Sequence, residues 1–132
     1  LVALVTQGSL YERMSGDTRY RTFTARHWDW LFGRNPWGVT MFTGVNWRYP
    51  TDVHLMTTRL TGRTIPGGLV DGAVYDHIFK SLRGVSLTRA DRFVAFQDPR
   101  AVYHDDWQDY STNEPIMDGT ASAILMLLVL EL

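Results

Sequence analysis

The sequence contains no cysteine among its 132 residues. Disulfide bridges, cysteine nucleophiles and zinc sites built on cysteine are therefore excluded. The absence of cysteine does not settle the redox compartment in which the protein works.

Long hydrophobic runs and a strong net charge are also missing. The terminal apolar stretch from Ala121 to Leu130 is shorter than the ~18 to 20 residues of a membrane-spanning helix, so we interpret it as a buried helix. The opening LVALV is too short for the apolar region of a signal peptide. The formal net charge is −1, which gives no bulk attraction to nucleic acid or to an anionic membrane, and neither partner is expected.

The residues that are present favour a packed domain. Hydrophobic residues make up 45% of the chain and charged residues 20%, unlike the composition of a disordered segment. The five Trp, six Tyr and six Phe gather in the middle of the chain and again in a late segment around Trp107. Such rings either fill a core or stack on the apolar faces of sugar rings, and composition leaves both interpretations open.

Two helices are predicted at the start of the chain. Apolar residues at helical spacing favour a helix over 1–14, and the SGD sequence at 15–17 ends it. Asp17 is expected to cap a second helix that runs to about Leu31. With a three-residue turn between them, the two helices would form an antiparallel hairpin.

The middle of the chain is predicted to be irregular. Glycine and proline interrupt the segment 35–71, where neither helical nor strand periodicity persists. A loop of this length is uncommon inside a compact domain and is usually functional. A short helix is expected within 71–82, and a second irregular stretch follows it to Thr112.

The last predicted helix, 119–132, is apolar on every face and should therefore be surrounded by other elements. Three or four helices cannot easily surround it and also cover two long loops. We therefore expect residues 1–132 to be a piece of a larger all-α domain, with large apolar faces exposed or paired with another chain.

The densest chemistry lies in YHDDWQDYSTNEP, residues 103–115. Ser111 and Glu114 fit the capping box S/T-x-x-E, which would make Glu114 a residue that ties off a helix N-terminus. The alternative is a general acid, because partial desolvation at the mouth of an apolar bundle raises the pKa of a carboxyl group. The residues alone leave both roles open.

Three aspartates come shortly before this glutamate. Asp105 lies between Tyr103 and Trp107 in sequence and is the best candidate for a buried, hydrogen-bonded carboxylate, whereas Asp106 and Asp109 are expected to be solvated. The aspartate spacing does not fit an EF-hand calcium loop, and the four histidines lack the paired spacing of a zinc site. No metal ion or cofactor is predicted.

His54 lies in the first irregular segment, in the run TDVHLMTTR. It is either a loop histidine without a function or, assisted by Arg59, a donor to a sugar hydroxyl. The sequence contains no Gly-x-Ser-x-Gly elbow, no P-loop and no dinucleotide-binding glycine pattern.

Three segments occur in the order FGRNPWGVTMFTGVN (32–46), IPGGLVDG (65–72) and VYHDDWQDYSTNE (102–114). Together they resemble the C-terminal third of the catalytic domain of glycoside hydrolase family 9, a cellulase family with an (α/α)6 barrel. The resemblance covers essentially the whole chain. It implies that residues 1–132 are an all-α C-terminal portion of such a barrel, with long irregular loops.

The most specific part of the resemblance is a pattern of two aromatic residues, an aspartate and a glutamate. Tyr103, Asp105, Tyr110 and Glu114 fill its places. By this resemblance Glu114 is the general acid and Asp105 is an active-site residue. The residues predicted to bind substrate are His54, Arg59, Tyr103, Trp107 and Tyr110.

The sequence departs from the family pattern at two places: the first bears on the substrate-binding arginine, and the second indicates a divergent subgroup with an altered subsite. The arginine that follows the family's histidine by two residues is Met56 here, with Arg59 further along. The small residue and the asparagine that usually follow the glutamate are replaced by Ile116 and Thr120.

The resemblance implies hydrolysis of β-1,4-glucan with inversion, by an acid and a base on opposite faces of the sugar. The family's base belongs to a D-A-G-D type motif, which this sequence does not contain. We therefore expect the chain to supply the acid without the base and to be inactive alone. Its expected partners are the glucan and either the missing N-terminal part of the barrel or a second copy of the chain; secretion or a periplasmic location is implied by the resemblance.

Two alternatives remain at this point. One is an exo-acting β-glucosidase or glucosaminidase of the same family. The other is a non-catalytic carbohydrate-binding fragment, which would bind sugars through its aromatic residues and leave Glu114 fully exposed and far from any groove.

Overall fold

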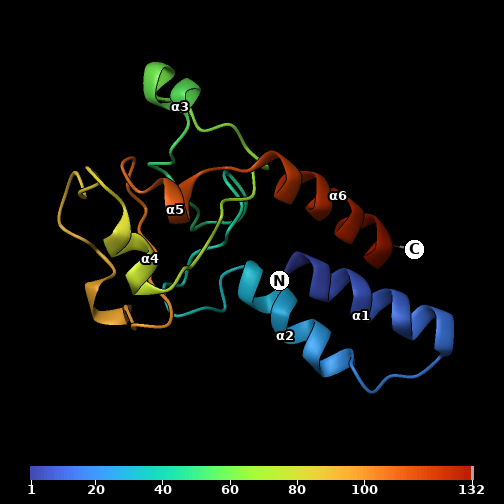
Figure 1. The fold of residues 1–132 in the computed structure, drawn as a ribbon. Helices are drawn as coiled ribbons and strands as arrows, with labels where there is room; N and C mark the ends of the chain where they lie inside the picture. The colour runs from blue at the N-terminus through green and yellow to red at the C-terminus, as the bar shows by residue number, and fades with distance from the viewer. Residues whose placement is uncertain (132) are drawn as a thin grey trace.

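A computed structural model describes residues 1–131, and over that range the chain consists of helices and irregular loops without a strand (Figure 1). The predicted all-α class is confirmed. The long helices are α1 (Val2–Ser15), α2 (Arg21–Leu31) and α6 (Met117–Glu131). Between α2 and α6 lie the short helices α3 (Met56–Thr61), α4 (Asp76–Ser81), the 3-10 helix η1 (Val94–Phe96) and α5 (Tyr110–Asn113).

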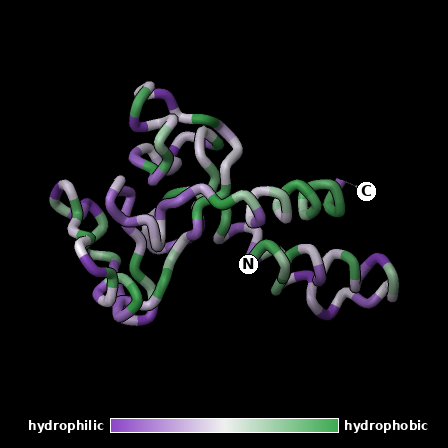
Figure 2. Tube along the Cα trace, turned by 45° about the horizontal axis from the view of Figure 1, so that its top comes forward, coloured by the Kyte–Doolittle hydropathy of each residue, from purple (hydrophilic) through white to green (hydrophobic). Residues whose placement is uncertain are grey.

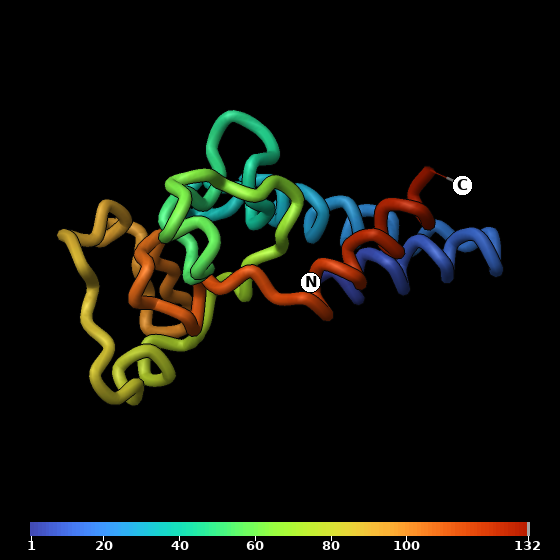
Figure 3. The backbone as a smooth tube through the Cα atoms, turned by 90° about the horizontal axis from the view of Figure 1, so that it is seen from above, coloured from blue at the N-terminus to red at the C-terminus, as the bar shows by residue number. Residues whose placement is uncertain are grey.

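The three long helices form one end of the molecule. Helices α1 and α2 make the predicted antiparallel hairpin, and α6 packs along α1 although the two lie at opposite ends of the sequence (Figures 1 and 3). Val5 and Met126 are fully buried between them. Gly16 ends α1 in the left-handed conformation, with φ 71°, and its N–H donates to the carbonyl of Glu12.

Asp17 does not cap α2, contrary to the prediction. The helix begins at Arg21 after Tyr20, whose side chain makes no capping hydrogen bond. The carboxylate of Asp17 instead accepts the backbone N–H of Arg19 at 2.9 Å and the hydroxyl of Tyr11 at 3.0 Å. These bonds hold Asp17 in the turn before the helix.

The segments between α2 and α6 form the other end of the molecule (Figure 1). They are mostly irregular, as predicted, although α3, η1 and α5 lie in stretches that were predicted to contain no helix. Isolated bridges join distant parts of them: Phe42 pairs with Leu69, Val70 with Pro115 and Val74 with Val102. The short helix expected within 71–82 is present as α4. Helix α3 was not predicted, because its sequence has no apolar periodicity.

Helix α6 is less covered than its composition predicts. Only Ala123, Met126 and Val129 are buried, while Ile124 and Leu128 are 57% and 52% exposed. Apolar residues continue along α6 toward the C-terminus (Figure 2). The expectation that α6 is surrounded is therefore wrong for residues 1–131, and the expectation of large exposed apolar faces is confirmed.

The predicted last residue of this helix, Leu132, lies outside the described residues. Within them, no helix has both the length and the apolar character needed to cross a bilayer.

Candidate active site

Asp105 joins two loops that are far apart in sequence. Its buried carboxylate accepts the N–H and the hydroxyl of Thr51 at 2.9 and 2.8 Å and the N–H of Asp52 at 2.8 Å. It also accepts from the guanidinium of Arg92 at 2.8 Å and from the side-chain amide of Asn113 at 3.2 Å. The expectation that Asp105 is buried and hydrogen-bonded is confirmed, and its contacts are those of a positioning residue.

His54 follows the loop that Asp105 anchors. Its Nδ1 lies 2.7 Å from the carbonyl oxygen of Trp107, and because a carbonyl can only accept, Nδ1 donates. The imidazole stacks on the Trp107 ring at 4.7 Å between centroids and meets the edge of Tyr110 at 5.8 Å. The guanidinium of Arg59 lies 5.6 Å from the Trp107 centroid. Four predicted substrate-binding residues are thus brought together from two segments.

Glu114 is held by its backbone, whereas its carboxylate is not engaged. The preceding residue, Asn113, is fully buried; its carbonyl accepts the N–H of His54 at 2.9 Å, and its Oδ1 accepts the hydroxyl of Tyr103 at 3.0 Å. The carbonyl of Glu114 accepts the N–H of Asp71 at 3.0 Å. Glu114 itself is half-buried, and its side chain has no hydrogen-bond or ion-pair partner among residues 1–131.

The capping box predicted for Ser111 and Glu114 does not form. Helix α5 is capped by Asp109, whose carboxylate accepts the N–H and the hydroxyl of Ser111 at 3.0 and 2.6 Å. Glu114 instead follows the end of α5 in an extended conformation, and α6 begins three residues later. The bridge between Pro115 and Val70 keeps the chain extended between the two helices.

Asp106 and Asp109 are buried, so the prediction that they are solvated is wrong. Asp106 accepts the N–H and the hydroxyl of Thr88 at 2.8 and 2.7 Å. Asp109 accepts from His104 Nδ1 at 2.6 Å. Burial raises the pKa of Asp109, but hydrogen bonds from His104, Ser111 and Thr112 outweigh it and lower the pKa overall. The D-x-S pattern at Asp109 was the sequence signal for its capping role.

Tyr103 also differs from its predicted role. Its ring is fully buried, and burial, reinforced by the nearby charge of Asp105, raises the pKa of the Tyr103 hydroxyl well above its ordinary value. A ring without exposed surface cannot stack on a sugar. Tyr103 therefore holds the side chain of Asn113 through a hydrogen bond and does not offer its ring to a substrate.

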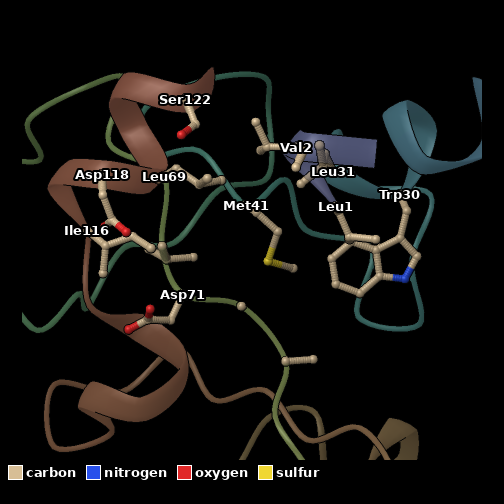
Figure 4. A pocket seen from close by; sticks show the side chains of 15 residues that line it. Leu1, Val2, Trp30, Leu31, Met41, Leu69, Asp71, Ile116, Asp118 and Ser122 are labelled. Carbon is tan, nitrogen blue, oxygen red and sulfur yellow. The ribbon is translucent and has the colours of Figure 1, made fainter. Parts of the chain in front are cut away.

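Asp71 was missed by the sequence interpretation. It lies with Asp118 at one side of a cleft of about 400 Å³, and Leu1, Trp30 and Met41 are among the other residues that line this cleft (Figure 4). None of the predicted site residues lines this cleft.

The pKa of Asp71 is raised to about 6, first by lost hydration and then by the negative charges of Glu114, Asp118 and Asp109. The segment IPGGLVDG, which contains Asp71, was the available sequence signal. Over residues 1–131 no group of three or more His, Asp or Glu side chains is arranged to hold a metal ion.

Comparison with protein families matches residues 2–127 to the model of the family described as Glycosyl hydrolase family 9. No curated protein and no solved structure matches the chain.

Proposed function

Because this chain belongs to glycosyl hydrolase family 9, we propose that it contributes the general acid of a glycosidase that cleaves β-1,4-linked glucan. The observation that carries the proposal is the state of Glu114. Its backbone is fixed by a buried, hydrogen-bonded neighbour, while its half-buried carboxyl group has no partner in the described structure and is available to a ligand.

In the proposed reaction, protonated Glu114 gives its proton to the glycosidic oxygen as the bond from that oxygen to the anomeric carbon breaks. A carboxylate on the opposite face takes a proton from the water that attacks the same carbon, so the configuration inverts. The two carboxyl groups stand roughly 6.5 to 9.5 Å apart in enzymes of this type. We propose that the base comes from outside these 132 residues, and that the chain alone does not turn over substrate.

Substrate binding is proposed for the cluster of His54, Arg59, Trp107 and Tyr110. Tyr110 is 40% exposed and offers a ring edge beside the imidazole. With Nδ1 of His54 donating to the Trp107 carbonyl, Nε2 of the neutral imidazole is an acceptor, so His54 would accept a hydrogen bond from a sugar hydroxyl rather than donate one as the sequence predicted. Asp105 holds this cluster against the segment that carries Glu114.

We further propose that residues 1–132 form a C-terminal portion of the catalytic domain, in which the apolar face of α6 packs against the remaining barrel helices. The exposed leucines of that face support this proposal. Because a polysaccharide substrate is encountered outside the cytoplasm, a secreted or periplasmic location is part of the proposal.

The two alternative functions suggested by the sequence are separated by different observations. The non-catalytic binding fragment was expected to leave Glu114 fully exposed, whereas Glu114 is half-buried, and this favours the catalytic proposal. Exo action on a terminal glucosyl or glucosaminyl unit is separated from endo action by comparing the products of long and short oligomers: an exo enzyme releases one size of product from both.

The test of the acid assignment is Glu114→Gln in the full-length protein. Hydrolysis of a glucan should fall by about 10²- to 10⁴-fold, because the poor leaving group needs the proton. Hydrolysis of an aryl glycoside with an acidic phenol should fall much less. Glu131→Gln, an exposed glutamate at the end of α6, is the matched control and should keep wild-type rates. Near wild-type hydrolysis of the glucan by Glu114→Gln would show that another residue is the acid.

A further inference from the structure

A second hollow, of about 500 Å³, lies between the segment 47–51 and the residues around η1, and none of its lining residues belongs to the His54 cluster. Its walls include Trp47, Tyr49 and Phe96 together with Arg48 and Arg92, and we call it the aromatic hollow. Its volume is in the range of small-ligand sites. No aspartate or glutamate lines it.

Two of the rings that line the aromatic hollow are accessible to solvent. Trp47 is 76% exposed and Phe96 is 55% exposed, whereas Trp37 and Phe93, which also line the hollow, are buried. Large apolar side chains gathered at an exposed concavity mark binding sites, because exposing them to water costs free energy that a ligand recovers. Flat rings with one open face suit the apolar C–H face of a pyranose.

The charge of the aromatic hollow has one sign. The guanidinium of Arg48 lies 4.7 Å from the Trp47 centroid, and that of Arg92 lies 4.6 Å from the Phe93 centroid. Arg48 forms no ion pair within residues 1–131. Arg92 donates to Asp105 at 2.8 Å, which leaves its remaining N–H groups for another acceptor. Planar guanidinium groups held on aromatic rings are suited to a carboxylate.

We propose that the aromatic hollow is a saccharide subsite for a sugar unit that carries a carboxylate, that is, a uronate unit of the polysaccharide chain. This inference rests on the proposed function, which makes the ligand a polysaccharide, and adds that one of its sugar units is negatively charged. A neutral glucosyl unit offers only hydroxyl acceptors to Arg48, and these form weaker hydrogen bonds with a guanidinium than a carboxylate does, so the subsite favours the acidic unit.

The aromatic hollow is connected to the proposed general acid. Arg92 donates to Asp105, and Asp105 also accepts from Asn113, the residue immediately before Glu114. A ligand in the aromatic hollow would therefore contact Arg92, which is hydrogen-bonded to the residue that positions the segment of the proposed acid.

The test measures binding by calorimetry to the full-length protein carrying Glu114→Gln, at low ionic strength. Two β-1,4-linked glucose oligomers of equal length are compared, one neutral and one oxidised to carboxylate at C6. The acidic oligomer should bind about tenfold more tightly, the gain expected from a charge-assisted hydrogen bond. The preference should shrink as salt is added.

Three variants assign this preference to the aromatic hollow. Arg48→Gln should abolish it, and Trp47→Ala should weaken the binding of both oligomers. Arg83→Gln removes the same charge from an exposed arginine outside the hollow and should leave the preference unchanged. Because Arg48, Trp47 and Arg83 are exposed, circular dichroism should show folded protein in each case.

Equal or tighter binding of the neutral oligomer overturns the inference, and so does a preference that survives Arg48→Gln or a failure of both oligomers to bind. These outcomes are separate from failure of the proposed function. Hydrolysis that survives Glu114→Gln would refute the acid assignment and leave the binding preference standing, whereas loss of the preference would leave the acid assignment intact.

Discussion

At the scale of residues, three carboxylates of one short segment have different surroundings. Asp105 accepts hydrogen bonds from Thr51, Asp52, Arg92 and Asn113, and Asp109 accepts from His104 and from the start of α5. Glu114 has a fixed backbone and an unengaged carboxyl group. Asp105 and Asp109 are thus tied into the loops, whereas the unengaged carboxyl group of Glu114 agrees with its proposed role as the acid.

Asp71 leads to a prediction about pH. Its pKa is about 6 in the folded protein against an ordinary 3.8, so between these values the folded state binds more protons than the unfolded state. The stability that Asp71 contributes is therefore present below pH 3.8 and lost as the pH rises through about 6. Asp71→Asn should match the wild type at low pH and be more stable above pH 6. Because solvent reaches Asp71, the difference should be small.

This prediction is measured by carboxyl NMR titration and by urea denaturation at several pH values. Glu114→Gln should lower the titration midpoint of Asp71, because the charge of Glu114 is one cause of the raised pKa. A wild-type midpoint near the ordinary value, or a midpoint that does not move in Glu114→Gln, would contradict the prediction.

At the scale of elements, the hairpin of α1 and α2 depends on a close approach at Gly8. A Cβ atom at this position would overlap the hydroxyl of Thr24. The Thr24 hydroxyl is buried and has no hydrogen-bond partner. The hairpin therefore depends on the absence of a side chain at Gly8 rather than on a bond to Thr24.

Gly8→Ala should destabilise the protein by about 1 to 3 kcal/mol through overpacking, although alanine is the better helix former. In a Thr24→Ala background the same change should cost little or become favourable, because the overlapping hydroxyl is gone. Urea denaturation of the four proteins of this cycle measures the coupling. The exposed Gln7→Ala serves as a control on α1 and should change little. A Gly8→Ala penalty that is unchanged by Thr24→Ala would contradict the close-approach explanation.

At the scale of the whole molecule, α6 presents an apolar face that the described residues do not cover. Leu125 and Leu128 are 54% and 52% exposed, whereas Met126 between them is fully buried against α1. A helix that packs against neighbours on two sides would show this pattern if the neighbours on one side were absent. It agrees with the proposal that the remaining barrel helices lie on this face.

A chain of these 132 residues should therefore bind a hydrophobic dye and self-associate. The double change Leu125→Lys and Leu128→Lys should reduce both without loss of helix content, since these side chains are already exposed. Met126→Lys is the matched change on the buried face and should reduce helix content, because it buries an unpaired charge. Dye fluorescence, sedimentation and circular dichroism measure the three properties. Dye binding that is unaffected by the double change would place the apolar surface elsewhere.

The sequence alone was enough to predict the long helices, the irregular middle and the family, because apolar periodicity, glycine and proline, and local motifs act over a few residues. It also identified Asp105 as buried, but it missed the burial of Asp106 and Asp109. Three other predictions from the sequence were wrong: the cap of α2 by Asp17, the capping box at Glu114 and the covering of α6. In each case the local sequence pattern does not include the tertiary contacts that decide the outcome.

Only the tertiary structure decided which polar groups are buried and which are available. Asp106 and Asp109 accept hydrogen bonds from Thr88 and His104, and the ring of Tyr103 packs in the core with Trp37 and Phe93. Asp71 stands beside the charge of Glu114 because its N–H pairs with the carbonyl of Glu114. Hydration and charge depend on neighbours in space, and those neighbours come from segments that no local sequence pattern joins.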